Sequence, residues 1–358
     1  MKEKLGIYII NYNGIRWLKK NLNNIVLNCD NHQIIIIDNN SDDNSVDYIK
    51  TNFPKVEIHI HTKNYGYSKG YNKILLQEKR FQYYILLNND VKVTKNWIQP
   101  MLDVIEKEGT EIVQPKILNA NRKNEFDYAG AAGGFIDIMG IPFCRGRILN
   151  TLENDNHQYN DDLKIFWASG CCFMVDSELF KRLKGLDEDF FMHQEEIDLC
   201  WRAQKENINI QYCSQSTIYH YGGGTLSNQN PIKSYYNHRN NILLLIKNLP
   251  IYLLMTILPI RLIIDYCIII CNVIFGAAYI VFMSPLYINK IYETNIEYGL
   301  RFIKKGFLIF SAHISILFLL KKIIQKRSPI YPKHIYHRSI IFDYYFMKKN
   351  KFHKLKKF

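Results

Sequence analysis

The first ninety residues alternate short, continuously apolar segments with amphipathic ones. Residues 33–37 and 83–87 carry strand-favouring, mostly apolar side chains, as strands do when both faces of their sheet are covered. Residues 15–28 instead place apolar side chains at helical spacing. Strands and helices in alternation predict an α/β fold whose sheet carries helices on both faces.

The same reading extends over the next stretch of the chain. We expect strands at residues 5–10, 33–37, 56–60, 83–87, 112–118, 165–175 and 208–213, and helices at 15–28, 43–51, 70–79, 177–184 and 194–205. The segment 112–118 is expected at an edge of the sheet. Residues 130–134 are expected to form a glycine-rich loop.

Small polar side chains follow each of the first four predicted strands. Any one such cluster is explained by a turn, because Asn and Asp favour turns. Ligands of open α/β sheets bind at the carboxyl ends of the strands, so four clusters at one edge predict a binding site. The clusters are Asn11-Tyr12-Asn13, Asp38-Asn39-Asn40, Asn64 with Gly66, and Asn88-Asn89-Asp90.

Three residues at the carboxyl ends of predicted strands have side chains that suit particular ligands. Asp38 lies too far upstream to cap a helix that starts near residue 44, so we expect it to accept from a nucleobase or a ribose hydroxyl. Asp90 offers hard oxygens to Mg²⁺ or Mn²⁺ beside a diphosphate. His220 ends a predicted strand before three glycines and is a candidate second metal ligand, which suits Mn²⁺ better.

A loop-to-helix junction carries three acids directly after an apolar loop: Glu195, Glu196 and Asp198. Acids at a helix start are favoured by the helix dipole alone. A partly desolvated carboxylate there also suits a general base. The sequence leaves open which of the three takes that role.

The net charge of +13 is concentrated at one end, because residues 321–358 hold twelve Lys/Arg against Asp343 alone. Such a basic tail suits anionic lipid or nucleic acid. The apolar stretches beside it, 262–283 and 307–320, favour lipid. The first is long enough to span a bilayer, and the second is expected to be too short. A single span would place the basic tail across the membrane from the N-terminal body, against the tendency of basic segments to stay on the cytoplasmic side. We therefore favour helices that lie in the membrane plane or form a re-entrant pair.

Hydrophobic content, cysteine pattern and the N-terminal residues indicate the class of chain and its cellular compartment. A hydrophobic content of 47% excludes a wholly disordered chain. The eight cysteines form no C-x-x-C pair, and we expect buried thiols and a reducing, cytosolic setting for the body. No signal-peptide pattern opens the chain. The predicted domains are residues 1–240, 241–325 and 326–358.

Eight motifs in one order carry a family resemblance over about residues 5–245. They are Asn11-Tyr12-Asn13, Ile37–Asp43, Asn64–Asn72, Leu86–Asp90, Ser169-Gly170, Gly185–Met192, Glu195–Arg202 and His220–Gly223. In this order and spacing the chain resembles family 2 glycosyltransferases with the GT-A fold, in their rhamnosyltransferase-like branch.

The resemblance implies an inverting, metal-dependent sugar transferase of cell-surface polysaccharide synthesis. Its donor would be a nucleoside diphosphate-sugar, with dTDP-rhamnose suggested by the branch, and its acceptor a lipid-linked or growing glycan at the cytoplasmic face of a membrane with anionic lipid. Asp38 would contact the base, Asp90 and His220 the Mn²⁺ or Mg²⁺ ion, and Glu196 would be the base, with Glu195 beside it. Donor-binding positions carried over are Asn11, Asp38, Asn64, Gly66, Asn72, Asn88, Asn89 and Arg239.

Two positions depart from the family pattern. Asn88 replaces the first acid of the family's Asp-x-Asp motif, and Glu196 replaces an Asp, which moves the carboxylate by about 1 Å, a distance at which misplacement affects rate. These departures motivate an alternative, a catalytically inactive relative that binds a nucleotide or glycan. A nucleic-acid binder is a third reading that rests on the tail alone, and we expect no nucleic-acid partner.

Overall fold

The computed structural model describes residues 2–107, 109–222, 230–283, 290–331 and 333–355, with backbone alone for 282–283 and 290–295. The chain divides into two compact units, one of Met1–Thr225 with Pro332–Phe358 and one of Leu226–Tyr331. The predicted domain boundaries were based on composition. The contacts within the structure instead group Pro332–Phe358 with the N-terminal residues.

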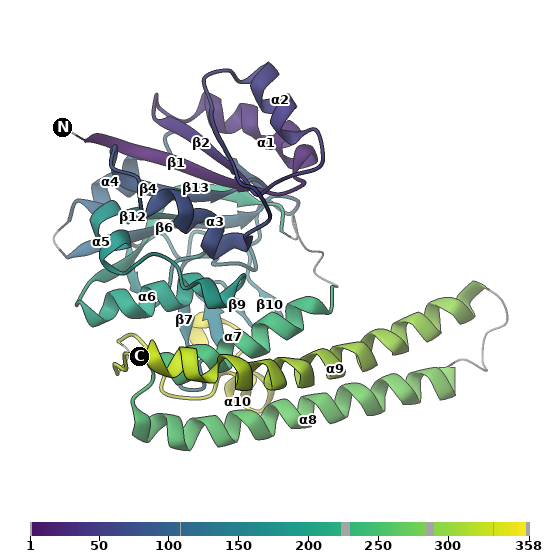
Figure 1. Ribbon diagram of the computed structural model, residues 1–358. Coiled ribbons are helices and arrows are strands. Elements are labelled where there is room, and N and C mark those ends of the chain that lie inside the picture. Colours follow the sequence, from purple (N-terminus) through teal and green to yellow (C-terminus); the bar gives the residue numbers. More distant parts are fainter. Residues whose placement is uncertain (1, 108, 223–229, 284–289, 332, 356–358) are drawn as a thin grey trace. The chain divides into compact units, whose positions relative to one another are not determined.

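The first unit is built on a mixed sheet with the strand order β11-β13-β6-β12-β4-β1-β2-β3, and β5 pairs with β13 (Figure 1). Strands β1 to β4 pair in parallel, whereas β12 runs antiparallel to both β4 and β6. This arrangement confirms the predicted α/β class. The strands are β1 (Glu3–Asn11), β2 (Gln33–Asp38), β3 (Glu57–Ile60), β4 (Phe81–Asn88), β5 (Val91–Val93), β6 (Thr110–Asn119), β11 (Leu163–Ile165), β12 (Cys172–Asp176) and β13 (Asn209–His220).

Helices cover both faces of this sheet because its central strands are apolar on both sides. Ile7, Ile36 and Ile85 face a core that includes Leu22 of α1 and Met101 of α4. On the other face, aromatic side chains of β1, β4 and α5 meet edge to edge. Burying one such side chain contributes roughly 1.5–3 kcal/mol. The helices of this unit are α1 (Ile15–Leu27), α2 (Ser45–Asn52), α3 (Gly66–Leu75), α4 (Gln99–Ile105), α5 (Ser177–Arg182), α6 (Glu195–Lys205) and α10 (Ile340–Tyr345).

Three predicted elements differ from those observed. Helix α3 begins at Gly66 rather than near residue 70, because Asn64 Oδ1 accepts from the Gly66 N–H and opens the helix early. Strand β6 lies inside the sheet, between β13 and β12, and not at an edge. Strand β13 runs on to His220 through a register shift between Cys213 and Thr217.

The predicted strand over residues 165–175 is two strands, β11 and β12, joined by a loop. The loop is held away from regular pairing by side chains of other elements. Gln114 Oε1 accepts from the Ser169 N–H at 2.8 Å, and Tyr67 donates to Gly170 O at 2.6 Å. The loop therefore belongs to the carboxyl-end edge of the sheet, where the candidate site lies.

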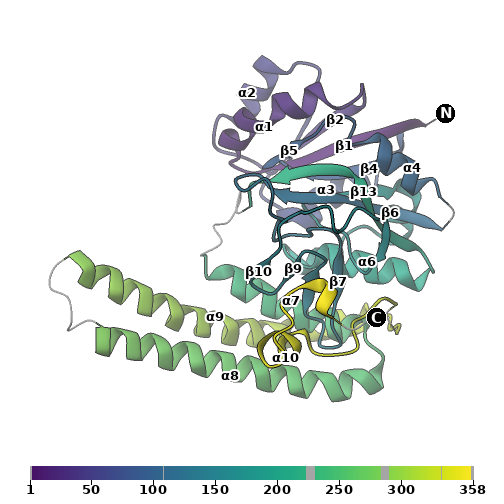
Figure 2. The same ribbon diagram turned by 180° about the vertical axis from the view of Figure 1, so that it is seen from behind.

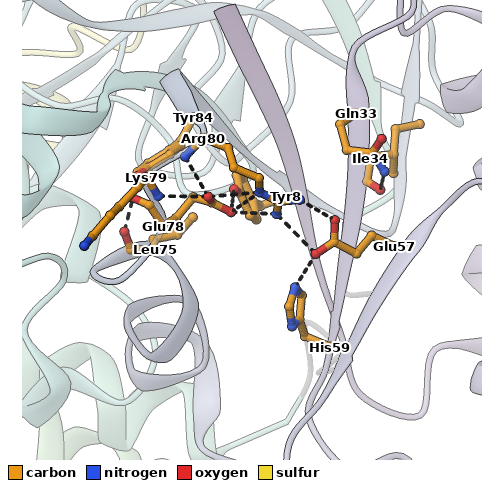
Figure 3. Close-up of polar contacts among 10 residues, drawn as sticks. All are labelled: Tyr8, Gln33, Ile34, Glu57, His59, Leu75, Glu78, Lys79, Arg80 and Tyr84. Carbon is orange, nitrogen blue, oxygen red and sulfur yellow. Dashed lines mark hydrogen bonds and ion pairs between the residues drawn. The ribbon is translucent and has the colours of Figure 1, made fainter. Parts of the chain in front are cut away.

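A polar network braces the strands β1, β3 and β4, near the amino ends of β3 and β4 (Figure 3). Arg80 bridges Glu57 at 2.8 Å and Glu78 at 2.7 Å, and Tyr8 donates to Glu78 at 2.9 Å. Burial alone would raise the pKa of Glu78, but the hydrogen bonds from Arg80 and Tyr8 lower it to about 2. The network therefore stabilises the ionised form of Glu78 and ties strands far apart in sequence.

A small antiparallel sheet, which the sequence analysis did not predict, carries the C-terminal residues of the chain. It consists of β7 (Gly134–Ile136), β8 (Pro142–Cys144), β9 (Arg147–Ile148) and β10 (Thr151–Leu152). Tyr336 N–H donates to Ile136 O at 2.8 Å, and the Phe352 ring lies on Phe135 and Phe143. Figure 2 shows this C-terminal segment in yellow beside β7. Residues 333–355 of the basic tail are thus a folded part of the first unit.

Over the residues described in it, the second unit consists of three helices, α7 (Ile232–Asn248), α8 (Ile251–Met283) and α9 (Lys290–Gln325). Helices α8 and α9 run side by side as a hairpin (Figures 1 and 2). Both are long and apolar enough to cross a membrane, over Ile251–Val281 and Ile296–Gln325. The expectation that the second stretch is too short was wrong, because the helix extends well beyond residues 307–320.

Glycines allow the two hairpin helices to approach closely. A Cβ at Gly276 would lie 2.6 Å from Gly299 O, and one at Gly299 would lie 2.8 Å from Gly276 O. Close backbone contact through small residues is typical of helix pairs in membranes. The outer surface of both helices is rich in exposed apolar side chains, among them Ile263, Ile270, Phe307 and Phe318.

Candidate functional site

The polar clusters at the carboxyl ends of β1, β2 and β4 form one hydrogen-bonded group. Asn11 Nδ2 donates to Asp38 Oδ2 at 2.9 Å, and Asn89 Nδ2 donates to Asn11 Oδ1 at 2.8 Å. The parallel register places Asn11 opposite Asp38 and Ile10 opposite Asn88. The predicted gathering of these side chains at one edge is therefore observed.

Asp38 is fully buried, and its carboxylate is already well supplied with donors. The Ser41 N–H and hydroxyl donate to it at 2.8 and 2.7 Å, in addition to Asn11. The carboxylate thereby fixes the turn after β2. A contact between Asp38 and a nucleobase would require one of these bonds to be exchanged, and it stays a prediction.

The segment Asn64–Asn72 packs against two neighbouring loops. Asn39 Nδ2 donates to Gly66 O at 2.9 Å, and Tyr67 N–H donates to Phe191 O at 3.1 Å. Asn72 clamps the backbone of Leu186 with its amide group, donating at 2.7 Å and accepting at 2.9 Å. Asn72 thus has a clear structural role, and a donor contact for it remains a prediction.

His220 lies between two aspartates at the end of β13. Its Nε2 is 3.3 Å from Asp90 Oδ1, and its Nδ1 is 2.9 Å from Asp127 Oδ1. All three side chains are buried. Burial alone would lower the pKa of His220, but Cys171, Asp90 and Asp127 raise it well above the usual value. Asp127 had no signal in the sequence, because only the fold brings it beside His220.

This trio is the arrangement expected of a metal-ligating histidine with an orienting partner. A ligating imidazole usually gives its other ring nitrogen to a carboxylate, as His220 does to Asp127. Asp90 and His220 Nε2 then face each other as one oxygen and one nitrogen donor, a set that fits Mn²⁺. Within the described ranges no cluster of three or more His, Cys, Asp or Glu residues has metal-site geometry, so a diphosphate would have to supply further ligands.

The three acids at the start of α6 have different surroundings. Asp198 is fully buried and bonded to Arg202 at 2.7 Å. Glu195 is buried and Glu196 is partly buried. In the part of the chain that the structure describes, one carboxylate oxygen of each glutamate has no hydrogen-bond partner. These two, unlike Asp198, are available for a proton transfer.

Burial raises the pKa of both glutamates. For Glu196 burial is the largest cause, partly opposed by backbone N–H groups that include that of Gly170, and the pKa rises to about 7. For Glu195 burial and the charge of Glu196 raise the pKa well above its usual range. A pKa near the working pH is what general-base catalysis favours.

The loop before α6 holds the glutamates in place through unusual backbone angles. Phe191, His193 and Gln194 have φ values of +58°, +67° and +70°. Non-glycine residues in this region are strained by roughly 1–3 kcal/mol each and cluster at functional sites. These angles could not be predicted from the sequence, since none of the three residues is glycine.

One loop, Ser169–Cys171, links the glutamates to the histidine group. Gly170 N–H interacts with the Glu196 carboxylate, and a Cβ at Gly170 would lie 3.6 Å from Glu196 Cδ. The next residue, Cys171, hydrogen-bonds His220 through its thiol and accepts from the Asn88 N–H at 2.9 Å. Consecutive residues therefore contact the candidate base and the candidate metal ligand.

One further predicted position belongs to the second unit. Arg239 belongs to α7 in the second unit, where its Nε donates to Asn240 Oδ1 at 2.9 Å and its guanidinium lies over Tyr236. Its contact with donor phosphates or acceptor remains a prediction. The glycines Gly223 and Gly224 after His220 lie outside the described residues.

Comparisons with known proteins identify the family of the chain. The profile of glycosyl transferase family 2 matches residues 6–184. The low-salt glycan biosynthesis hexosyltransferase Agl10 of Haloferax volcanii is 27% identical over 222 residues, 60% of this chain and 66% of Agl10. The N-acetylglucosaminyl-diphospho-decaprenol L-rhamnosyltransferase of Mycobacterium tuberculosis is 21% identical over 203 residues, 52% of this chain and 66% of the relative. The chain thus spans slightly less than two-thirds of either relative.

Among solved structures, GalNAc-T7 with UDP, GalNAc and Mn²⁺ aligns with a TM-score of 0.54. The alignment covers 70% of this chain and 48% of GalNAc-T7, at 16% identity. It supports the GT-A fold, as expected from the sequence. The chain belongs to glycosyl transferase family 2 and is similar to a hexosyltransferase and to a rhamnosyltransferase.

Proposed function

We propose that this enzyme transfers a sugar from a nucleoside diphosphate-sugar to a lipid-linked glycan acceptor at a membrane, with dTDP-rhamnose as the first donor to test. One observation carries the proposal. The adjacent residues Gly170 and Cys171 contact Glu196 and His220, so a candidate base and a candidate diphosphate-side ligand lie at either end of one short loop. A donor bound between them would present its anomeric carbon to the base side.

Asp90 and His220 would hold the divalent ion that accompanies the donor. When bound, such an ion would supply positive charge against the departing diphosphate. Asp127 would keep the His220 ring oriented by accepting from Nδ1, which leaves Nε2 for the ion. Asn88, in place of the family's first acid, would contribute an amide oxygen rather than a charge.

Glu196 would act as the general base. Its carboxylate would take the proton of an acceptor hydroxyl, the hydroxyl oxygen would form a bond to the anomeric carbon, and the bond from that carbon to the diphosphate oxygen would break. Attack opposite the leaving group inverts the anomeric configuration. Glu195, whose pKa is raised still further, would stay protonated and leave Glu196 as the single negative charge of the pair.

The membrane association rests on the helical hairpin of the second unit. Since Met1–Thr225 and Pro332–Phe358 form one compact unit, they lie on one side of any membrane, and the hairpin between them crosses it twice or not at all. This arrangement keeps the basic C-terminal residues with the catalytic unit, in line with the positive-inside tendency at the cytoplasmic face. The named acceptor of the mycobacterial relative, a diphospho-decaprenol, is why a lipid-linked acceptor is proposed.

Turnover is the direct test. Full-length protein in nanodiscs would be given dTDP-rhamnose, UDP-sugars or GDP-sugars with Mn²⁺ and a polyprenyl-diphospho-sugar, and the released nucleoside diphosphate and the extended lipid would be measured. Transfer by the wild type, lost in Glu196→Gln and kept in the surface variant Glu178→Gln, supports the proposal. Donor binding without any turnover by the wild type would favour the inactive-relative reading.

A further inference from the structure

Helix α10 and the two residues that follow it leave four large apolar side chains in solvent. Phe342, Tyr345, Phe346 and Met347 are 48, 53, 73 and 50% exposed. Two of them, Phe342 and Phe346, stack on each other with ring centroids 5.2 Å apart. These four exposed apolar residues, so close together in the chain, form a patch, which we call the α10 aromatic patch, and such patches mark interaction sites.

The patch is held rigidly because its neighbours on both sides are bonded to the small sheet. Ile340 N–H donates to Asp137 Oδ2 at 2.9 Å, and the Tyr344 hydroxyl lies 2.8 Å from Thr151 Oγ1. Further on, Phe352 N–H donates to Glu153 Oε1 at 3.1 Å. Ile340 and Tyr336 are buried in this contact. The segment therefore buries one apolar face and presents a second one outward.

A buried carboxylate fixes the local fold of the patch. Asp343 is fully buried and accepts from the Tyr336 hydroxyl, from Arg338 at 3.2 Å and from Lys349 at 3.3 Å. Its partners neutralise the only acid between residues 333 and 355. The aromatic side chains are thus displayed by a folded element and not by a loose tail.

The charges around the patch are basic. Lys348, Lys351 and Lys354 are exposed, and no acid of the segment remains to balance them. Aromatic side chains flanked by lysines are what the interface of an anionic bilayer favours, because the rings enter the headgroup region and the lysines meet the phosphates. Each lysine near such a surface contributes about fivefold in affinity.

Chain connectivity keeps the patch near the bilayer. Only fourteen residues separate the end of α9 at Gln325 from the start of α10 at Ile340, a reach of at most about 50 Å. We infer that the α10 aromatic patch is a second membrane contact, which lays the catalytic unit on an anionic bilayer surface. The inference rests on the membrane association proposed above and adds a contact made by the catalytic unit itself.

Photo-crosslinking in nanodiscs tests this contact. Full-length protein carrying p-benzoylphenylalanine in place of Phe346 would be placed in nanodiscs of phosphatidylcholine with phosphatidylglycerol. After irradiation, the mass of the intact protein would be measured by mass spectrometry. The control position is Leu27, which is 74% exposed on α1 of the same unit. The expected result is a lipid adduct at position 346 and none at position 27, with a yield that falls in Lys348→Glu/Lys351→Glu.

Other outcomes overturn the inference in distinguishable ways. A crosslink from position 346 to a second copy of the chain, or no lipid adduct at 346 in a sample that enters nanodiscs and turns over donor, would reject the patch contact and leave the proposed function standing. Failure of the protein to enter nanodiscs at all would reject the membrane association and the patch contact together.

Discussion

Asp127 and His220 lie 93 positions apart in the chain, yet their side chains meet at 2.9 Å. The contact orients the imidazole, because Nδ1 is engaged and Nε2 is turned toward Asp90, 3.3 Å away. Asp127 also accepts from the Ala129 N–H at 2.8 Å, so its own position is fixed by the backbone. Asp127 therefore orients the candidate metal ligand His220 and need not touch the ion itself.

Asp127→Asn should weaken Mn²⁺ binding without abolishing it. Loss of such an orienting carboxylate typically lowers metal affinity by about 10- to 100-fold. Electron paramagnetic resonance of free Mn²⁺, titrated with protein and nucleoside diphosphate, measures the affinity directly. Asp103→Asn on the exposed face of α4 is the matched control, and equal affinities for the two variants would contradict the role of Asp127.

Glu196→Gln should lower turnover by about 10²–10⁴-fold, the usual contribution of a general base, while donor binding is kept. The pH dependence has a definite sign. The pKa of Glu196 is raised to about 7, and a base must be deprotonated, so kcat/KM should rise with pH through about 7 and level off above it. A profile that is flat from pH 5 to 8 would exclude Glu196 as the base.

Gly66→Ala should disturb the donor loop. Gly66 has φ of +75°, and a Cβ there would lie 2.7 Å from the Phe191 ring. We expect a loss of roughly 1–3 kcal/mol in the free energy of unfolding together with weaker donor binding, measured by thermal unfolding and by ligand titration. Gly109→Ala shares the positive φ, +74°, and meets only the end of Asn209 at 3.1 Å, so it should lose stability without losing donor affinity.

Asp265→Asn should loosen the helical hairpin. Asp265 of α8 is fully buried and joins three helices, with His238 of α7 at 2.8 Å, His313 of α9 at 3.0 Å and Arg261 one turn earlier. Removing one partner of a buried ion pair costs about 3–5 kcal/mol. The midpoint of thermal unfolding in nanodiscs should fall clearly, whereas Glu297→Gln on the exposed side of α9 should leave it unchanged. Equal midpoints would show that the network is dispensable.

The local pattern of the chain predicted the first half of the sheet well. Strands such as Gln33–Asp38 are apolar without interruption and end in polar clusters, so both their burial and their functional edge follow from sequence. The interior position of β6 was missed, because a strand's place in a sheet depends on pairing across the chain. The length of α9 was also underestimated, because only its uncharged stretch was counted. The helix continues past the charged residues Arg301, Lys304 and Lys305.

The candidate site was predicted where motifs are local and missed where contacts are long-range. Asn11, Asp90 and Glu196 could be named from short motifs, whereas Asp127 reaches the site only through the fold. The folded C-terminal segment was missed for the same reason. Its lysines dominate the composition, and the few apolar residues that anchor it, such as Ile340 and Phe352, give no periodic signal.

A thermal-shift panel tests whether the protein binds a nucleotide-sugar donor together with a divalent ion at His220. Wild type and His220→Ala would be heated with UDP-, GDP- and dTDP-sugars, each with Mn²⁺, Mg²⁺ or EDTA, and each shift would be taken against the variant's own baseline. A donor at a hundred times its dissociation constant stabilises by about 2.7 kcal/mol. We predict that one nucleotide class raises the unfolding temperature of the wild type only when the metal is present. We predict that this shift is lost in His220→Ala. A shift that is the same in EDTA, or no shift with any donor, would contradict it.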